Sequence, residues 1–485
     1  MTNINQIIKE IYRKGNLFGV DQLLSNNPFQ VVGKRPNSVA LCGGAFGDEG
    51  KGRVADELTA NFLQKCPEVV LYRDNGGSNA GHSVEVGNQK MVLHQLGSGV
   101  FNHNCYSISG KDMVIHPIDL VEEIRLVKQT TGGKIPATLM IDEMAALCLD
   151  THRAFEYAIT FAARGYASST GRGIAPAYAD LIYRQPLRMR DLIRPTWKKL
   201  FSQHYHFYEK IIHGLDLELK NIKVTRLAKA SQTVGPLSTF LARLAKTRKT
   251  LQPFIQPCYE FVAKQWSDKR TAFVFEKAQA LGLDLHWAVY PDCTVSDCTF
   301  EGIHTSTEGI VDPNNIAVNT AVIKATYTSS VGSRILPSHM PDPLASTIRE
   351  DAHEYGATTG RPRDIHYLDI PLLSYLLRVG RVEYLVPTHM DIVYPNQPIK
   401  VCVGYQKNGK AVDYRPDQEY LLDIKPVFIE LPSWDKSQLQ SANKPQELPE
   451  TALKYLAFLQ ATLKVKILMI TTGPKRDQTL RWFCN

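Results

Sequence analysis

The sequence has no apolar run near the about 18 consecutive residues that a membrane span needs, and its first residues lack the charged-then-apolar order of a secretory signal. Its nine cysteines are scattered, without a paired C-x-x-C motif, which argues against a disulfide framework. Cys293 and Cys298 are the closest pair, but no further Cys or His stands nearby at zinc-ligand spacing. We therefore expect a cytoplasmic protein with no membrane association and with reduced, mostly buried thiols.

Internal repeats and low-complexity segments are also missing, and the composition is that of a folded protein. The chain has 485 residues, of which 44% are hydrophobic and 21% charged, so a large buried core is available. The net charge of +8 suits either nucleic acid or a pocket for a polyanionic small substrate. A solvated helix face explains the basic run at residues 246–250, so nucleic acid is the less favoured partner.

Short apolar runs alternate with helical patterns along the chain. The predicted strands are residues 38–42, 69–72, 272–275, 383–386 and 466–470. A helix is predicted at residues 151–163, with Asp150 as its cap and Gly165 as its end, and residues 196–270 are expected to be helical. This alternation favours an α/β fold, in which a large, mainly parallel β-sheet is flanked by helices and carries helical insertions.

The N-terminal part differs from the rest. Residues 1–36 contain one short amphipathic helix, at residues 7–12, followed by a polar stretch, and they carry none of the motifs described below. We interpret residues 1–36 as an N-terminal extension and residues 37–485 as a single catalytic domain.

The first motif with chemical meaning is the glycine-rich segment 43–52, between a predicted strand and a helical pattern. Successive glycines let backbone N–H groups converge on phosphate oxygens, and Lys51 adds a positive charge, so the loop is a P-loop-like phosphate cradle. It is not a Walker A motif, because Ala45 stands where that pattern needs Gly and Gly52 where it needs Ser or Thr. Asp48 is therefore a candidate metal ligand or base.

Two further motifs follow. Residues 75–83 come directly after a predicted strand and place the imidazole of His82 in a loop of small residues, where it can reach a ligand. Residues 168–178 combine hydroxyl groups, glycines and Arg172, as a phosphate-binding turn does. Each motif alone is also compatible with an ordinary surface loop.

Taken together and in this order, the three motifs resemble the adenylosuccinate synthetase family, ligases that join aspartate to the 6-position of inosine monophosphate (IMP) using GTP. The similarity continues at residues 275–279, 290–291, 356–363, 368–369 and 471–476. It runs from about Ser38 to Arg476 and leaves the N-terminal extension outside. The resemblance implies a reaction through a 6-phosphoryl intermediate, which the amine of aspartate then displaces.

The resemblance also implies roles for individual residues. Asp48 takes the proton from N1 of the purine, His82 donates to the transferred phosphoryl group, and Lys51 neutralises the triphosphate together with Mg²⁺. The implied ligands of Mg²⁺ are Asp48 and Gly81. The remaining implied residues bind the three substrates. The purine monophosphate is bound by Asn79, Thr170, Arg184, Gln279 and Thr294, and aspartate by Thr358, Thr359, Arg361 and Arg363. GTP is bound by Gly47, Glu49, Gly50, Lys51, Gly52, His389, Asp391, Thr472 and Gly473. In the family the arginine at position 184 reaches into the partner subunit, which implies a homodimer with shared active sites.

Several positions depart from the family pattern. Ser78 replaces a histidine, Ala280 a glycine, and residues 295–297 a Ser-Ser-Asn stretch. The usual Thr-Arg-Val-Gly lacks its arginine, which is Ser330 here, and the usual Thr-Lys-x-Asp has His389 in place of lysine. These changes lie in regions of substrate specificity, whereas the pair of catalytic residues is intact.

Three hypotheses remain open from the sequence. The favoured one is a GTP-dependent ligase acting on IMP and aspartate. The second is a paralogue with the same phosphoryl-transfer chemistry on a different purine monophosphate, amine donor or triphosphate such as ATP. The third, a nucleic-acid-binding or regulatory protein without turnover, is the weakest, because such a protein has no need for Asp48, Lys51 and His82 together.

Overall fold

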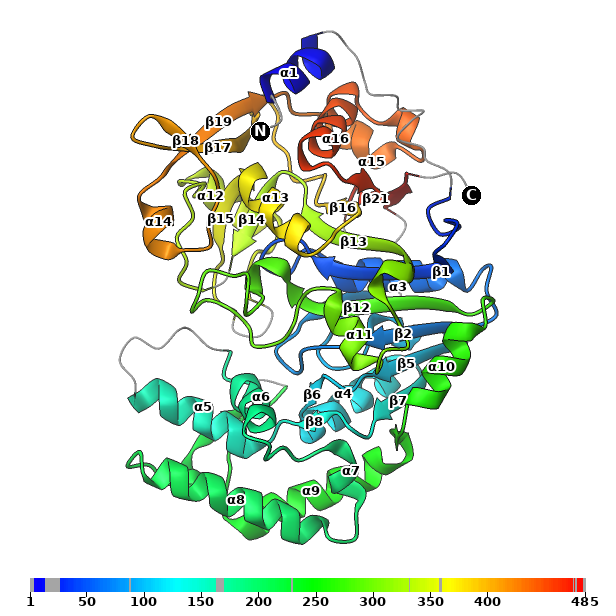
Figure 1. Cartoon of the computed structure of the whole chain (residues 1–485), viewed down its shortest axis with the longest axis vertical. Coiled ribbons are helices and arrows are strands. Elements are labelled where there is room, and N and C mark those ends of the chain that lie inside the picture. The colour runs from blue at the N-terminus through cyan, green and yellow to red at the C-terminus, as the bar shows by residue number, and fades with distance from the viewer. Residues whose placement is uncertain are drawn as a thin grey trace.

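A nine-stranded sheet forms the centre of the computed structural model, which describes residues 4–13, 27–86, 89–162, 170–227, 230–330, 332–356, 360–473, 475 and 478–482 (Figure 1). The strand order is β11 (Ile255–Gln256), β7 (Thr138–Asp142), β5 (Cys105–Ser109), β2 (Val69–Arg73), β12 (Ala272–Ala280), β1 (Arg35–Gly43), β13 (Ile316–Lys324), β16 (Tyr384–Thr388) and β20 (Lys466–Ile467). All neighbouring pairs are parallel. The predicted α/β fold with a large parallel sheet is confirmed.

Smaller sheets surround this centre. A five-stranded sheet contains β14 (Tyr327–Ser330), β15 (Asp364–Asp369), β17 (Ile399–Lys407), β18 (Lys410–Val412) and β19 (Lys425–Leu431). Four two-stranded pairs are β3 (His82–Val86) with β4 (Gln89–Leu93), β6 (Val114–Ile115) with β8 (Ala146–Leu147), β9 (Lys223–Thr225) with β10 (Ser231–Thr233), and β21 (Met469–Thr471) with β22 (Thr479–Arg481).

The helices fall into groups. One group, which flanks the sheets or connects their strands, consists of α3 (Lys51–Phe62), α4 (Pro117–Thr130), α10 (Tyr259–Ser267), α11 (Glu301–Ser306), α12 (Leu344–Asp351), α13 (Ile370–Val379), α14 (Gln418–Leu422), α15 (Lys436–Ser441) and α16 (Glu450–Leu463). The helical insertion at one end of the molecule consists of α5 (Asp150–Ala162), α6 (Ile174–Ile182), α7 (Met189–Ile193), α8 (Trp197–His213) and α9 (Leu237–Leu251) (Figure 1). The N-terminal α1 (Ile4–Ile8) continues into a π-helical turn, Lys9–Arg13.

Strand β1 shows how the core is divided. Val39 and Leu41 belong to one large hydrophobic cluster, and Ala40 and Cys42, between and after them, belong to the other. Successive side chains of a strand point to opposite faces, so the two clusters lie on the two sides of the sheet. Burial on both faces is why the central strands are continuous apolar runs in the sequence.

Most predicted elements are present, but residues 196–270, expected to be helical, contain the strands β9, β10 and β11 as well as the helices α8, α9 and α10. The five predicted strands correspond to β1, β2, β12, β16 and the pair β20 and β21. Asp150, expected as a cap, is the first residue of α5, and its carboxylate accepts hydrogen bonds from Arg226 instead. The expected end of that helix at Gly165 lies outside the described residues.

The N-terminal segment 4–13 packs against α16 with Ile7 and Ile11 buried, and the division of the chain at residue 36 stays a prediction. Among the described cysteines all are free, and only Cys293 is not fully buried. No helix in the described parts of the chain is long and apolar enough to cross a membrane.

A close approach fixes the start of α3 against β3. A Cβ atom added at Gly52 would lie 2.8 Å from the Cβ atom of His82 and 3.1 Å from its backbone carbonyl carbon. Real Cβ atoms do not approach so closely, so only glycine lets the phosphate loop and the histidine motif meet. The two motifs, separated along the chain, are therefore in direct contact.

We predict that Gly52→Ala destabilises the protein. A glycine-to-alanine change inside a helix normally raises the free energy of unfolding by up to about 1 kcal/mol. Here the new methyl group would be overpacked against His82, so the free energy of unfolding should instead fall by about 1–3 kcal/mol. Urea unfolding measures the difference. Gly404→Ala is the matched control, because its new Cβ atom would meet nothing nearer than 4.0 Å. Equal stabilities of the Gly52→Ala and Gly404→Ala proteins would contradict the assigned contact.

Candidate active site

The motifs predicted to carry the chemistry meet at the carboxyl edge of the parallel sheet. Strand β1 leads into the phosphate loop 43–52, and β2 leads into the loop 74–82 that carries His82. Strands β12, β13 and β16 end nearby at Ala280, Lys324 and Thr388. Ligand sites of open parallel sheets form at this edge, so the strand order explains why distant parts of the sequence converge.

The phosphate loop binds an internal anion. The Glu49 carboxylate accepts hydrogen bonds from the N–H groups of Ala45, at 3.2 Å, and Gly47, at 2.7 Å, and it lies 3.0 Å from the Lys51 Nζ. Gly47 and Gly50 have a φ of 96°, a conformation that favours glycine. Burial lowers the pKa of Lys51, but Glu49 more than offsets this, so the pKa is raised and the ammonium stays charged. The loop thus provides the converging donors that a phosphate requires.

Asp48 projects from the middle of this loop. Its left-handed backbone, with φ of 57°, turns the carboxylate toward Arg363, with which it forms an ion pair. Arg363 is buried and also bonds Glu354 at 2.7 Å, whereas the Asp48 side chain keeps 33% exposure. The loop aspartate is therefore held in place by a buried guanidinium while remaining accessible to a ligand.

A carboxylate on strand β12 orients the ring of His82. Its Nδ1 lies 2.6 Å from the carboxylate of Glu276, which also accepts the N–H of Ser98 at 2.8 Å. Burial lowers the pKa of His82, and Glu276 opposes that shift. The carboxylate holds the Nδ1 proton, so the Nε2 atom is the one left for a ligand.

Sequence reasoning missed Glu276 as the residue that orients His82. The signal was present, because the predicted strand continues as Phe275-Glu276-Lys277 and a charge inside a fully buried strand needs a partner. Lys277 has its own partner, the buried Asp74 at the end of β2. Two neighbouring charges of β12 thus fix both ends of the loop 74–82.

The residues expected to hold the purine monophosphate are only partly brought together. Gln279 lies against the loop 74–82, since a Cβ atom at Gly76 would come within 3.1 Å of its Oε1. The Asn79 Oδ1 and the Gln279 Nε2 are buried and have no hydrogen-bond partner among the described residues. Thr294 is fixed by its N–H, which donates to the Leu283 carbonyl at 2.7 Å. Unsatisfied buried polar atoms are uncommon and mark positions where a ligand can bind.

The other two monophosphate residues belong to the helical insertion. Thr170 precedes α6 and Arg184 follows it, and both side chains are exposed. Arg184 has a left-handed backbone, with φ of 60°. Its N–H donates to the carbonyl of Leu181 at 3.1 Å, within the same turn.

The predicted aspartate loop separates into two environments. Thr358 and Thr359 lie outside the described residues, and Arg361 is exposed. Arg363 instead lies inside, between Asp48 and Glu354. The two arginines, which flank Pro362, therefore differ in what they can do: one faces solvent and the other supports the phosphate loop.

The predicted guanine residues lie where β16 ends beside β21. Nδ1 of His389 lies 3.0 Å from the hydroxyl of Tyr327. Burial, and to a lesser extent the positive charge of Lys324, lowers the pKa of His389 to about 4, so its imidazole is neutral near pH 7. Burial raises the pKa of Asp391. The loop with Thr472 and Gly473 is tied to α3, because the guanidinium of Arg53 donates to the backbone carbonyl of Gly473.

A small pocket opens beside the phosphate loop. Its polar lining includes Glu49, Lys324, Tyr327 and Ser329. Lys324, at the end of β13, lies 2.5 Å from the Glu354 carboxylate, which is also bonded to Arg363. Sequence reasoning missed Lys324 and Glu354; the lysine that ends the apolar run Ala321-Val322-Ile323 was the available signal.

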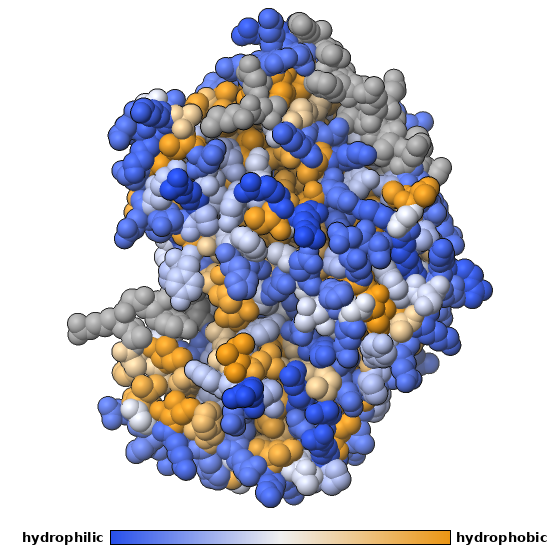
Figure 2. Space-filling view, in the orientation of Figure 1, coloured by the Kyte–Doolittle hydropathy of each residue, from blue (hydrophilic) through white to orange (hydrophobic). Residues whose placement is uncertain are grey.

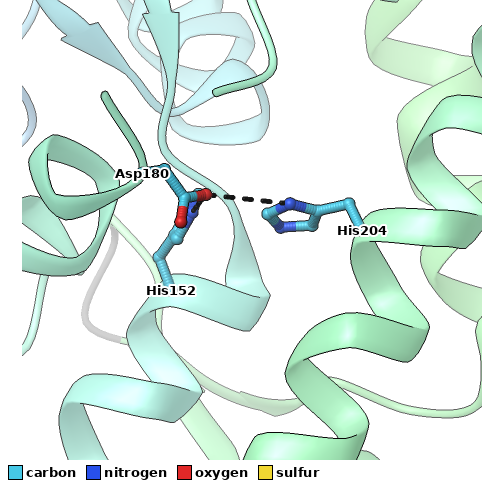
Figure 3. Close-up of side chains that lie close together, drawn as sticks. All are labelled: His152, Asp180 and His204. Atoms are coloured by element: carbon cyan, nitrogen blue, oxygen red, sulfur yellow. Dashed lines mark hydrogen bonds and ion pairs between the residues drawn. The ribbon is translucent and has the colours of Figure 1, made fainter. Parts of the chain in front are cut away.

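A second cluster of metal-ligand residue types lies in the helical insertion, where His152, Asp180 and His204 face one another (Figure 3). Nδ1 of His152 accepts the N–H of Leu149 at 2.8 Å, so its Nε2 carries the proton and donates to the Asp180 carboxylate at 2.9 Å. Metal ligation through that Nε2 would need the other tautomer. Tyr208 donates to the other Asp180 oxygen at 2.8 Å. The cluster is therefore a hydrogen-bonded network that anchors α6.

Comparisons with known proteins agree with this site. The model of the adenylosuccinate synthetase family matches residues 40–480. Adenylosuccinate synthetases from Clostridium botulinum (strain Eklund 17B / Type B) and Thermodesulfovibrio yellowstonii are each 34% identical to the chain, over 444 and 446 residues. These alignments cover 91% and 92% of this chain and 98% of each relative.

Solved structures agree as well. The fully ligated adenylosuccinate synthetase from Plasmodium falciparum has a TM-score of 0.80 and 26% identity, covering 92% of this chain and 99% of that one. Cyanophage S-2L succinoaminodeoxyadenylate synthetase, with 18% identity and a TM-score of 0.52 over 92% of this chain and 95% of that one, shares the fold. The chain belongs to the adenylosuccinate synthetase family, the GTP-dependent ligases that join L-aspartate to the 6-position of IMP.

Proposed function

We propose that this chain performs the family reaction at the carboxyl edge of its parallel sheet, with Asp48, Lys51 and His82 as its catalytic residues. The observation that carries the proposal is the meeting of these three side chains around one anion-binding loop. Asp48 and Lys51 belong to that loop, and His82 touches it at Gly52. A base, a fixed cation and an imidazole around a phosphate cradle are the parts that phosphoryl transfer to a purine oxygen requires.

Asp48 acts as the general base. Its partly exposed carboxylate takes the proton from N1 of IMP, and the resulting O6 anion attacks the γ-phosphate of GTP. Arg363 keeps the carboxylate aimed, because the guanidinium is buried and fixed by Glu354. A carboxylate held in this way can accept a proton without first having to be positioned.

Charge that develops on the transferred phosphoryl group is stabilised by the surrounding donors. The N–H groups of the phosphate loop and the ammonium of Lys51 converge on one place, which the Glu49 carboxylate occupies here. Because Glu276 holds the Nδ1 proton, His82 donates from Nε2 as the imidazolium; burial disfavours this form, and a bound phosphate opposes that effect of burial on the pKa of His82. The oxygen donors of Asp48 and Gly81 suit Mg²⁺, which would neutralise the triphosphate when bound.

The three substrates have separate places in this proposal. Asn79, Gln279 and Thr294 bind the purine monophosphate, supported by the unsatisfied atoms of the first two. Thr358, Thr359 and Arg361 bind aspartate, and the buried Arg363 adds its positive charge from its place between Asp48 and Glu354. His389, Asp391, Thr472 and Gly473 bind the guanine nucleotide beside Gly47, Glu49, Gly50, Lys51 and Gly52. The alternative of another purine, amine donor or triphosphate rests on the substitutions at Ser330 and His389 alone and is not favoured by the family match.

We also propose that the protein is a homodimer. Large side chains that are exposed on α5 and at the end of α6, two helices in contact, are Tyr157, Phe161, Ile182 and Tyr183, at 51%, 68%, 81% and 69% exposure, and Figure 2 shows hydrophobic residues gathered at this end of the molecule. Exposed large apolar side chains gathered in this way support a protein interface. Arg184 directly follows Tyr183, so a second copy seated there places this arginine at the partner's site.

The first prediction tests Asp48 as the base. Phosphate release by the wild-type protein with IMP, aspartate, GTP and Mg²⁺ should fall by at least about 10²-fold in Asp48→Asn, because the shape is kept and the base is lost. Asp216→Asn is the matched control, since Asp216 is an exposed aspartate with a similar backbone, φ of 59°. Near-normal turnover of Asp48→Asn would eliminate the assigned role.

The second prediction tests the shared site. Mixing inactive Asp48→Asn with inactive Arg184→Ala subunits should restore about a quarter of wild-type activity, because half of the dimers are mixed and each holds one intact site. Asp48→Asn mixed with Lys51→Ala is the control and should stay inactive, since both residues act within one chain. Absence of recovery after verified subunit exchange would argue against the shared site.

The third prediction concerns the triphosphate. An ionised Asp391 can accept both N1–H and the 2-amino group of guanine, whereas adenine has no donor at N1. GTP should therefore have a higher kcat/KM than ATP. Asp391→Ala should remove the preference, since an unpaired donor costs about 1–3 kcal/mol, while the KM for aspartate should stay unchanged. A preference that survives the substitution would place guanine recognition elsewhere.

A further inference from the structure

Arg334 brings a buried positive charge to the edge of the site. It follows β14 in the chain and is only 3% exposed. Its guanidinium carbon lies 4.5 Å from the centre of the Phe46 ring, and Phe46 belongs to the phosphate loop. Its Nη1 donates to the hydroxyl of Ser330 at 2.6 Å. One side chain thus connects the end of β14 with the phosphate loop.

The same segment holds the loop that leads to Thr294. Nη2 of Arg334 donates to the backbone carbonyl of Asp292 at 2.6 Å. The N–H and the hydroxyl of Ser333 both donate to the Asp292 carboxylate, each at 2.9 Å. Asp292 is therefore held at its backbone and at its side chain, two residues before a predicted ligand of the purine monophosphate.

A charge in this place is costly to keep. Burial lowers the pKa of Arg334, and the neighbouring Asp292 only partly opposes that shift. The nearby His366 adds no charge, because burial lowers its pKa to about 3. A buried guanidinium is retained where its planar, directional hydrogen bonds fix several segments at once.

The position of the guanidinium relative to Ser330 explains a departure from the family pattern. Ser330 stands where the motif Thr-Arg-Val-Gly has arginine, so the sequence lacks a charge at that point. Here the head of Arg334 touches the Ser330 hydroxyl itself. An arginine side chain spans several ångströms, so its charged group can reach the same region from a backbone position four residues away.

We propose that Arg334 is a positioning residue that supplies from position 334 the guanidinium that the chain lacks at position 330, and thereby holds the loop 290–294 against the phosphate loop. This inference rests on the proposed function, because it assigns the loop 290–294 to the purine monophosphate. Arg334 acts through the two loops and need not touch a substrate.

The test moves the arginine from position 334 to position 330. Arg334→Ala should lower kcat/KM for IMP by about 10- to 100-fold, with a raised KM for IMP and a reduced kcat, because small displacements of positioning groups are costly. The double variant Ser330→Arg/Arg334→Ala should return to within about threefold of wild type, since the charge is restored in the same region. Ser330→Arg alone should be impaired, because two guanidinium groups would compete for one buried place.

Arg35 provides the matched control. It is also a buried arginine, lies 4.7 Å from the ring centre of Trp266 and donates to backbone carbonyls, but it stands at the amino end of β1, away from the site. Arg35→Ala should reduce stability in urea while leaving the KM for IMP unchanged. A merely structural Arg334 would behave in the same way and would gain no activity from Ser330→Arg.

Two results would overturn the inference: wild-type KM and kcat in Arg334→Ala, or an impaired Arg334→Ala that the added Ser330→Arg does not rescue. If Arg334→Ala does not fold, the double variant and Arg334→Lys carry the test, and Arg334→Lys should show an intermediate KM. Calorimetry measures IMP binding without turnover, so it can test the role of Arg334 separately from the proposed catalytic function. A wild-type protein that neither binds IMP nor releases phosphate would refute the proposed function itself.

Discussion

The parallel pairing of β1 with β12 and β13 is the constraint on which the site depends. In this register Gly43 lies opposite Ala280 on one side and Val322 on the other. The phosphate loop therefore leaves the sheet at the same level as Gln279 and just before Lys324. Because parallel strands all end at one edge, a single register choice brings together motifs that lie more than 200 residues apart in the chain.

Once these strand ends are buried, each charge on them needs a partner. Lys51 has Glu49, Lys277 has Asp74, and Lys324 has Glu354. Such pairs contribute little net stability compared with apolar packing, but breaking one leaves an uncompensated buried charge, so they specify one arrangement of the loops. The pair in the phosphate loop has a further consequence. The N–H groups and the ammonium that hold the Glu49 carboxylate would serve a phosphate equally well, so the loop is already shaped for an anion.

Local patterns in the sequence were sufficient for the fold, and they also predicted where the chemistry takes place. Apolar runs that are buried on both faces predicted the central strands, and the glycine loop between a strand and a helix predicted the phosphate cradle. The residues that orient the catalytic groups could not be found in this way. Glu276 reaches His82, and Glu354 reaches Arg363 and Lys324, through contacts between distant segments. No spacing rule encodes such contacts, because they depend on which strands become neighbours.

The same distinction governs the comparison with the family. When the sequence is compared with the family motif position by position, Ser330 replaces an arginine, which suggests a changed substrate specificity. In space, the guanidinium of Arg334 lies at the Ser330 hydroxyl, so charge is present in that region. A binding site requires a chemical group at a place, not a residue at a position, and a long side chain can provide it from elsewhere on the backbone. A substitution in a motif therefore indicates altered function only after the surrounding side chains have been examined for a replacement.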